Sequence, residues 1–303
     1  MELNAKKMMN SLSKGNSILK AIQENDRKHL QKVLTMMLRD LMKVTDKYGI
    51  VMPVAYGNVL GAVRHHGFIP WDDDLDVYMM RKDWEKFKKV FDKELGYKYI
   101  LEGPNTNELC PKNTFPKVYL KGTEFTDIYD VNTPYQHGIY IDIFITDYVP
   151  SSKLLQKIDG FVSKVIKFGI NSQTYYQYPN PVMEKFMHQS GGAIFYLWLR
   201  KTFGLFFSFA SHRVWCNWFD KFYGRYSSKS HKITVPVQNY NLEVMDESVI
   251  YPVTVGDYEG IKVYLPGKTH EYLVQNYGPN YMEIPPVEKR EDHMIVNLDF
   301  GKY

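Results

Sequence analysis

Four aspartates fall within five positions of the segment GFIPWDDDLDVYM, residues 67–79, between flanks that are almost wholly apolar. Side chains alternate along an extended chain, so a strand over 71–79 would direct Asp72, Asp74 and Asp76 to one face and Asp73 to the other. Three carboxylates on one strand face repel one another unless a cation lies among them. Because carboxylate oxygens suit hard ions, the segment predicts a site for Mg²⁺, Mn²⁺ or Ca²⁺.

Two other interpretations of the acidic run are possible. A solvated turn rich in aspartate remains open on the sequence alone. A calcium loop of the EF-hand type is excluded, because Val77 stands where that loop needs glycine and Asp83 stands where it needs a bidentate glutamate.

Asp142 lies in a second segment typical of a strand, IYIDIFI, residues 139–145. Its isoleucines share one face, and Asp142 is on the opposite face. A carboxylate between β-branched residues is costly to bury unless it is paired or binds a metal. The segment predicts a further metal ligand or a general base, with a capped or edge-exposed aspartate as the alternative.

The stretch Tyr56-Gly57-Asn58 begins a predicted helix directly after a β-prone segment. A helix N-terminus offers backbone N–H groups to a phosphate, although asparagine is also an ordinary N-cap. With the acidic run a dozen or so residues later, the arrangement predicts phosphate bound beside metal, as in phosphoryl transfer.

Helices and strands must position these residues, and the periodicity of the hydrophobic residues predicts where those helices and strands lie. The spacing predicts an α+β fold, with a mixed sheet flanked by helices and an aromatic-rich helical insertion. We expect one catalytic domain over 1–303, with 27–150 and 231–303 forming the core and 151–230 the insertion. Helices are expected over 27–48, 56–63, 82–95, much of 153–226 and 268–278, and strands over 50–55, 71–79, four segments of 97–149, and 258–266.

The amino-acid composition limits the classes of partner and predicts the cellular compartment. A net charge of +4 without a run of Lys and Arg argues against a nucleic-acid partner. Two cysteines far apart form no disulfide framework, and residues 1–17 lack the apolar stretch of a signal peptide. We therefore expect a cytoplasmic protein. The apolar runs 193–199 and 203–210, separated by Arg200-Lys201, predict buried or amphipathic helices, or peripheral contact through 193–226 with the inner face of a membrane.

Several motifs together resemble the LicD family, which comprises phosphocholine transferases and relatives such as the fukutin-type ribitol-phosphate transferases. The resemblance runs from about residue 45 to the C-terminus and is weakest over 153–230. The matching motifs are YGNVLGAVRHHGFIPWDDDLDV (56–77), IDIFITD (141–147), YEGIKVYLP (258–266), EYLVQNYGPNYMEIPP (271–286), and Arg290 with His293.

The resemblance implies a nucleotidyltransferase-like fold and transfer of a phospho-alcohol from a CDP-linked donor. It places Asp74 and Asp76 on the family's metal-binding acidic pair, with Asp72 just upstream, and Asp142 on the later strand aspartate. Asp74, Asp76 and Asp142 are the expected catalytic residues, with Mg²⁺ or Mn²⁺ as cofactor. Asn58 departs from the family, where Thr or Ser is usual, but it can still cap a helix and bind a phosphate.

The remaining site candidates concern the donor. Tyr56, Gly57 and Asn58 would bind its phosphates at the helix start. Arg64 and Lys117 are candidate diphosphate clamps, although each could be a surface charge. On the family's pattern, Arg290 and His293 complete the pocket. The adjacent His65 and His66 would point apart on a helix, which argues against zinc.

The expected reaction moves phosphocholine from CDP-choline to a hydroxyl of a cell-surface glycan or its lipid-linked precursor, and CMP leaves. Three alternatives stay open: transfer of ribitol, glycerol or ethanolamine phosphate from its CDP donor, nucleotidyl transfer from an NTP with release of pyrophosphate, and a non-catalytic glycan-binding module.

Overall fold

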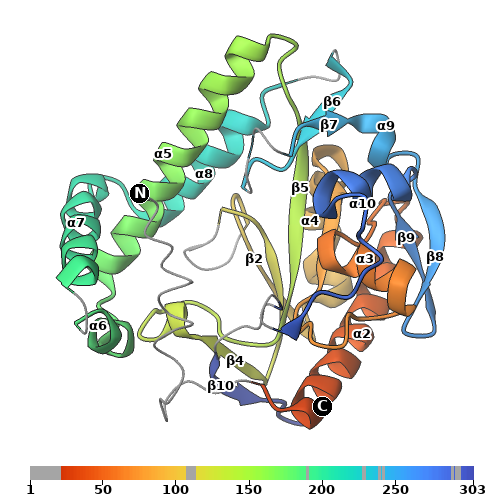
Figure 1. Ribbon diagram of the computed structural model, residues 1–303, viewed down its shortest axis with the longest axis horizontal. Coiled ribbons are helices and arrows are strands. Elements are labelled where there is room, and N and C mark those ends of the chain that lie inside the picture. The colour runs from red at the N-terminus through yellow and green to blue at the C-terminus, as the bar shows by residue number, and fades with distance from the viewer. Residues whose placement is uncertain are drawn as a thin grey trace.

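A computed structural model describes residues 22–106, 114–188, 191–226, 230–237, 240, 243–287, 290 and 295–303. The chain has an α+β fold, as the sequence predicts, with one mixed sheet at its centre and helices around it (Figure 1).

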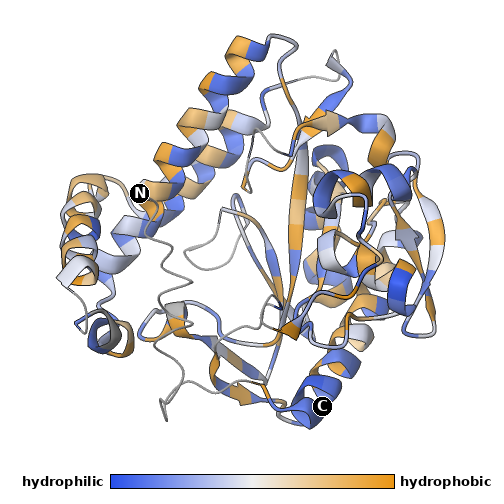
Figure 2. Cartoon of the chain, in the orientation of Figure 1, coloured by the Kyte–Doolittle hydropathy of each residue, from blue (hydrophilic) through white to orange (hydrophobic). Residues whose placement is uncertain are grey.

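Strand β5 (Tyr140–Tyr148) organises the sheet. It pairs in parallel with β1 (Asp76–Met80) and antiparallel with β3 (Lys117–Leu120) and β6 (Lys232–Thr234). The sheet is completed by β2 (Tyr99–Glu102) beside β3 and β7 (Met245–Asp246) beside β6. The odd-numbered isoleucines of β5 are buried, as the alternation predicts, and Figure 2 shows this strand as mainly hydrophobic.

Helices α2 (Glu24–Lys47) and α4 (Arg81–Leu95) pack on this sheet. Each buries a stripe at helical spacing, which in α4 consists of Trp84, Phe87, Phe91 and Leu95. Gly49, at φ 59°, follows the end of α2, where the sequence predicts a stop. Helix α3 (Tyr56–His65) lies nearby and contacts β1.

The C-terminal third returns to the same core. Here a short helix α9 (Glu247–Ile250) precedes strands β8 (Thr254–Tyr258) and β9 (Ile261–Leu265), and α10 (Thr269–Tyr277) follows them. Of the strand predicted over 258–266, residues 261–265 are confirmed as β9, but Glu259 and Gly260 both adopt positive φ and form the turn of a hairpin with β8. Strand β10 (Ile295–Asp299) pairs with β4 (Glu124–Asp127), which leads into the short helix η1 (Ile128–Asp130).

Two other predicted strands differ from the structure. Residues 50–55 form only isolated bridges, from Pro53 to Tyr264 and from Val54 to Val77. The acidic strand begins at Asp76, and residues 72–75 before it belong to no helix or strand. Sequence patterning detects extended backbone, whereas a strand also needs a partner along its whole length.

The middle of the chain forms a group of helices at the left of Figure 1. They are α5 (Lys153–Gln177), α6 (Pro181–Met187), α7 (Gly191–Phe207) and α8 (His212–Tyr223). This is the region predicted as a helical insertion. The division of the chain into core and insertion stays a prediction.

An ion-pair network connects these helices to the sheet. The Arg81 guanidinium, at the start of α4, binds both carboxylate oxygens of Asp147 at 2.8 and 2.6 Å and also pairs with Asp220 on α8. Side-chain exposure is 22% for Arg81, 4% for Asp147 and 7% for Asp220. Asn105 donates a further hydrogen bond to Asp220.

We expect Arg81→Met to lower the free energy of unfolding by about 3–5 kcal/mol, because two buried carboxylates would lose their counter-charge. Urea denaturation followed by circular dichroism measures this. Lys262→Met is the matched control, since its pair with Asp257 is exposed and should contribute nothing measurable. Equal stability of Arg81→Met and the wild type would contradict the assignment.

Candidate active site

The parallel pairing of β1 with β5 brings two predicted site residues together. Asp76 is the register partner of Asp142, so they occupy neighbouring positions on adjacent strands, about 4.8 Å apart along the sheet. On the other side of β5, Lys117 is the register partner of Asp142, and its Nζ lies 2.7 Å from Asp142 Oδ1. Lys117 is 8% exposed, which excludes the surface-charge interpretation.

The aspartates that precede β1 form a compact cluster. Ligand oxygens of Asp72, Asp73 and Asp74 all lie within 4.8 Å of one another. The prediction that Asp73 points to the opposite face is wrong, because these residues precede the strand and do not follow its alternation. Carboxylate oxygens at such spacing suit a hard divalent cation.

The electrostatics of Asp76 connect the cluster to Asp142. Burial raises the pKa of the Asp76 carboxyl well above its ordinary value, and the carboxylates of Asp74, Asp142 and Asp72 raise it further, whereas Lys117 opposes the shift. Desolvation and like charges both disfavour the ionised form. A bound cation would reverse this balance, so the residues present fit a metal.

Asn58, on α3, binds the backbone of the acidic segment through its side-chain amide. Its Oδ1 accepts a hydrogen bond from the Asp76 N–H at 2.7 Å, and its Nδ2 donates to the Asp74 carbonyl at 3.3 Å and to Tyr258 Oη at 2.9 Å. The side chain is 1% exposed, and both of its N–H donors and one lone pair of its Oδ1 are engaged. Asn58 therefore positions the aspartates, and a contact of its side chain with phosphate stays a prediction.

The start of α3 lies against Asp72. A Cβ at Gly57 would be 2.9 Å from Asp72 Oδ2, so glycine permits this approach. The Tyr56 N–H donates to Tyr272 Oη at 2.9 Å and the Asn58 N–H to Ala55 O at 2.9 Å. Two of the three backbone N–H groups proposed for phosphate already have partners.

Tyr56 begins α3 with φ 42°, an uncommon conformation for a residue with a side chain. Its ring packs edge-on against Phe144 and Tyr78, with ring centroids 5.1 and 5.3 Å away. Tyr272 Oη, which accepts the hydrogen bond of the Tyr56 N–H and shares another with Tyr78 Oη, holds it there. Strain of this kind persists where the surroundings fix it, often at functional sites.

Arg64 and Arg290 meet at Trp71, immediately before the acidic run. The Arg290 guanidinium carbon lies 4.1 Å from the indole centroid and that of Arg64 lies 6.0 Å away. Arg64 also donates to the carbonyls of Tyr281 and Glu283. Arg64 therefore anchors the C-terminal segment near the site, and its role as a clamp stays a prediction. His293 lies outside the described residues.

Sequence reasoning missed Glu243 and Lys167. The Tyr56 hydroxyl donates to Glu243 Oε2 at 3.3 Å, and burial raises the pKa of the Glu243 carboxyl to about 7, against the effect of the Tyr56 hydrogen bond and Lys167. Burial lowers the pKa of Lys167, on α5, to about 8. Neither residue lies in a chemical motif, so only the folded chain brings Glu243 to Tyr56 and the charge of Lys167 into range of Glu243.

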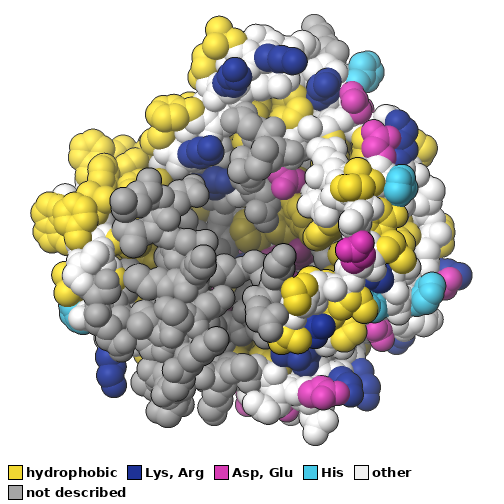
Figure 3. All heavy atoms as spheres, in the orientation of Figure 1, with side chains coloured by type: hydrophobic (Ala, Val, Ile, Leu, Met, Phe, Trp, Pro, Cys, Tyr) yellow, Lys and Arg dark blue, Asp and Glu magenta, His cyan; other side chains and the backbone are white. Residues whose placement is uncertain are grey.

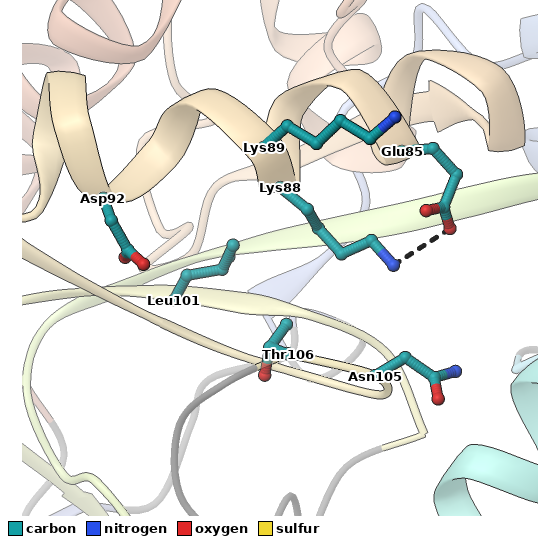
Figure 4. Close-up of a pocket in the computed structure, with 7 residues that line it drawn as sticks. All are labelled: Glu85, Lys88, Lys89, Asp92, Leu101, Asn105 and Thr106. Carbon is teal, nitrogen blue, oxygen red and sulfur yellow. Dashed lines mark ion pairs between the residues drawn. The ribbon is translucent and has the colours of Figure 1, made fainter.

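A pocket of about 280 Å³ lies elsewhere, between α4 and the end of β2 (Figure 4). The figure labels Glu85, Lys88, Lys89, Asp92, Leu101, Asn105 and Thr106 along its wall. Lys88 and Glu85 form an ion pair of 2.9 Å. The pocket contains no aspartate of the cluster, so it does not form part of the candidate active site.

Comparison with known proteins adds to this geometry. Residues 49–158 match the family model described as LicD/FKTN/FKRP, nucleotidyltransferase domain. The chain carries a LicD family domain. The resemblance seen in the sequence is confirmed, and the aspartate cluster, Asp142 and Lys117 all lie within the matched residues.

Individual relatives extend the match. The lipopolysaccharide cholinephosphotransferase LicD of Haemophilus influenzae is 26% identical over 252 residues, which are 82% of this chain and 89% of that protein. An uncharacterized protein of Rickettsia typhi is 39% identical over 67 residues, 22% of each chain. Mannosyltransferase regulator 4 of Saccharomyces cerevisiae is 29% identical over 126 residues, 39% of this chain and 10% of that protein.

The candidate active site includes residues outside 49–158, the range that matches the family model. Tyr258 and Tyr272 supply hydrogen bonds to Asn58 and Tyr56, and Glu243 and Arg290 approach from segments that follow the helices. The site is therefore assembled from both ends of the chain.

Glu243 should impose a pH dependence on stability. Because its pKa is raised from 4.5 to about 7 on folding, ionising it costs free energy, so the unfolding free energy falls as pH rises through that interval. We expect Glu243→Gln to gain up to about 3 kcal/mol relative to the wild type between about pH 5 and pH 8. Urea midpoints at both pH values measure this. Glu271→Gln, at an exposed ion pair, should show no such gain, and a parallel pH dependence of wild type and Glu243→Gln would contradict the prediction.

Proposed function

We propose that this protein transfers a phospho-alcohol from a CDP-linked donor to a hydroxyl of a glycan or a lipid-linked glycan, with release of CMP. Phosphocholine from CDP-choline is the donor group we favour. The bond between the acceptor oxygen and phosphorus forms, the bond from phosphorus to the CMP oxygen breaks, and the acceptor proton passes to a carboxylate.

One observation carries the proposal. The carboxylates of a LicD family domain gather at the start of the β1–β5 pair, with Asp76 and Asp142 in register and Asp72, Asp73 and Asp74 beside them. Similarity to a cholinephosphotransferase over 82% of this chain supports the choice of reaction.

Asp74 and Asp76, with Asp72 and Asp142, would hold the metal, and Mg²⁺ or Mn²⁺ suits their oxygen donors. The ion supplies charge neutralisation for the donor diphosphate and its leaving group. Asp73 joins the candidate ligands because its carboxylate lies in the same cluster.

The chain's own residues would bind and orient the reactants. Lys117 holds Asp142 in place through their ion pair, and its Nζ also lies 3.5 Å from the centre of the Tyr140 ring. The ammonium of Lys117 and the carboxylate of Asp142 are therefore fixed before substrate binds. Asp142 is the candidate acceptor for the proton of the attacking hydroxyl. Preorganised charge of this kind contributes most of the catalysis in phosphoryl transfer.

The surroundings of Tyr56 support a cationic head group. Its ring, the ring of Phe144 and the Glu243 carboxyl lie together near Asp76. Aromatic faces and a carboxylate attract a quaternary ammonium, whereas ribitol or glycerol offers only hydroxyls. This arrangement favours a cationic alcohol such as choline over ribitol and glycerol.

Asp74→Asn should lose Mg²⁺-dependent binding of CDP-choline and at least about 100-fold in CMP release, with little change in folding. Isothermal titration with CDP-choline, CDP-ribitol, CDP-glycerol, CDP-ethanolamine, CTP, ATP and a glycan, each with and without Mg²⁺, measures donor choice. Asp257→Asn is the matched control, because that aspartate forms an exposed pair with Lys262.

Each outcome of that panel has a meaning. Binding of one CDP-alcohol, lost in Asp74→Asn, supports the proposal and names the donor. Binding of CTP or ATP alone, with release of pyrophosphate, would replace it with nucleotidyl transfer. Glycan binding without any nucleotide binding would replace it with a glycan-binding module.

Lys117→Met should increase the stabilisation that Mg²⁺ provides. Removing the ammonium beside Asp142 increases repulsion among the carboxylates in the metal-free protein, and a cation then relieves more of it. The measurement is the rise in melting temperature on adding Mg²⁺, compared between variant and wild type. An equal or smaller rise in the variant would argue against a metal among these residues.

A further inference from the structure

Helix α7 has an inverted arrangement of side chains. Its buried residues are Ala193, Leu197 and Gly204, two of them small. Phe195, Trp198 and Phe206 are 61%, 60% and 71% exposed. A helix on the surface of a water-soluble domain normally directs its large apolar residues inward and its polar residues outward.

Glycines set the contact between α7 and α5. A Cβ at Gly204 would lie 2.2 Å from the Ser172 carbonyl oxygen, and one at Gly169 would lie 2.2 Å from the Phe207 ring. Small residues that let helices approach closely, with large apolar residues on the outside, are typical of helices in contact with lipid.

The neighbouring helices also expose large hydrophobic side chains. Of the 21 large hydrophobic residues that are exposed in the described parts of the chain, 15 lie between residues 154 and 218. Figure 2 shows α7 as mainly hydrophobic, and Figure 3 shows hydrophobic side chains gathered over it at the left edge of the molecule. A monomeric soluble protein rarely leaves so many together, so this surface has a partner.

Positive charge accompanies the apolar surface. Residues 151–226 contain ten of the chain's 38 Lys and Arg residues but three of its 34 Asp and Glu residues. All three acidic residues are paired with a cation: Asp159 with Arg225, Glu184 with Lys201, and Asp220 with Arg81. Exposed lysines, among them Lys153, Lys157 and Lys164 on α5, alternate with exposed apolar residues, and Figure 3 shows Lys and Arg along the top of the molecule over α5.

We propose that helices α5, α7 and α8 form a docking surface for an anionic lipid bilayer. Their exposed Phe and Trp side chains would enter the interface, and the lysines would contact the lipid phosphates. Among the helices that the structure describes, none is long and apolar enough to cross a membrane, so the contact lies along the bilayer surface. The inference goes beyond the proposed function and does not depend on the donor chemistry.

Vesicle flotation tests the surface directly. The full-length protein is mixed with vesicles of phosphatidylcholine and phosphatidylglycerol in equal parts, or of phosphatidylcholine alone. We expect binding to the anionic vesicles, weakened by salt, and at least about tenfold weaker partitioning for the double variant Phe195→Ser, Trp198→Ser. Each of Lys157→Gln and Lys164→Gln should weaken it about fivefold.

Tyr97→Ser and Val287→Ser are the matched controls, because these residues are 79% and 68% exposed but lie outside the surface. They should bind vesicles like the wild type. Circular dichroism verifies that the double variant is folded, as expected for exposed positions.

Three results would overturn the inference: no vesicle binding by the wild type, equal loss in the control variants, or a dimer that the double variant dissociates in sedimentation without any vesicle binding. Isothermal titration of CDP-choline on the same double variant separates the two proposals. If the wild type binds no vesicles while both proteins bind CDP-choline, the docking surface alone is refuted. If the wild type binds vesicles but neither protein binds CDP-choline, the proposed function alone is refuted.

Discussion

Repulsion among carboxylates at the start of the β1–β5 pair is the constraint that the rest of the fold has to meet. Asp76 and Asp142 are in register on adjacent strands, and Asp72, Asp73 and Asp74 are clustered beside them. Such a concentration of charge would open an isolated hairpin or a loosely held loop. It persists here because the backbone that carries the aspartates is held by a buried amide, Asn58, and by a parallel strand pair whose opposite face is packed with isoleucines.

The aromatic surroundings make that support rigid. Hydroxyl groups of Tyr258, Tyr272 and Tyr78 connect Asn58, the start of α3 and β1 through hydrogen bonds of 2.9 Å. Buried networks of this kind lower the mobility of the groups they join, and their low dielectric strengthens every charge interaction nearby. Two of these tyrosines come from β8 and α10, so the matched family range alone does not make the site.

The sequence was most informative where one segment contains a complete pattern. The buried stripe of α4 and the alternation of β5 predicted both elements, because each depends on local periodicity. The acidic run predicted that carboxylates gather at this point, but not that Asp73 joins Asp72 and Asp74. Asp73 was misplaced because it lies three residues before the strand begins, where side chains do not follow the alternation. Glu243 and Lys167 could not be found, since the contact of Glu243 with Tyr56 and the effect of Lys167 on Glu243 depend on how α5 and the segment before β7 pack. Long-range packing leaves no periodic trace in a single sequence.

The helices α5–α8 expose large apolar side chains, whereas the sheet buries its own. The two parts therefore need a fixed connection. Arg81 provides one, because it joins the end of β1 and β5 to Asp220 on α8. Lys167 on α5 provides a second, since it donates a hydrogen bond to the Val237 carbonyl at 2.9 Å and its charge acts on the Glu243 carboxyl. A helix group that rests on a lipid surface would thereby hold the carboxylate cluster at a fixed height above that surface. For an acceptor anchored in lipid, this geometry would restrict which of its hydroxyls reach Asp142, so selectivity for the acceptor could arise from distance to the membrane as well as from contacts in the site.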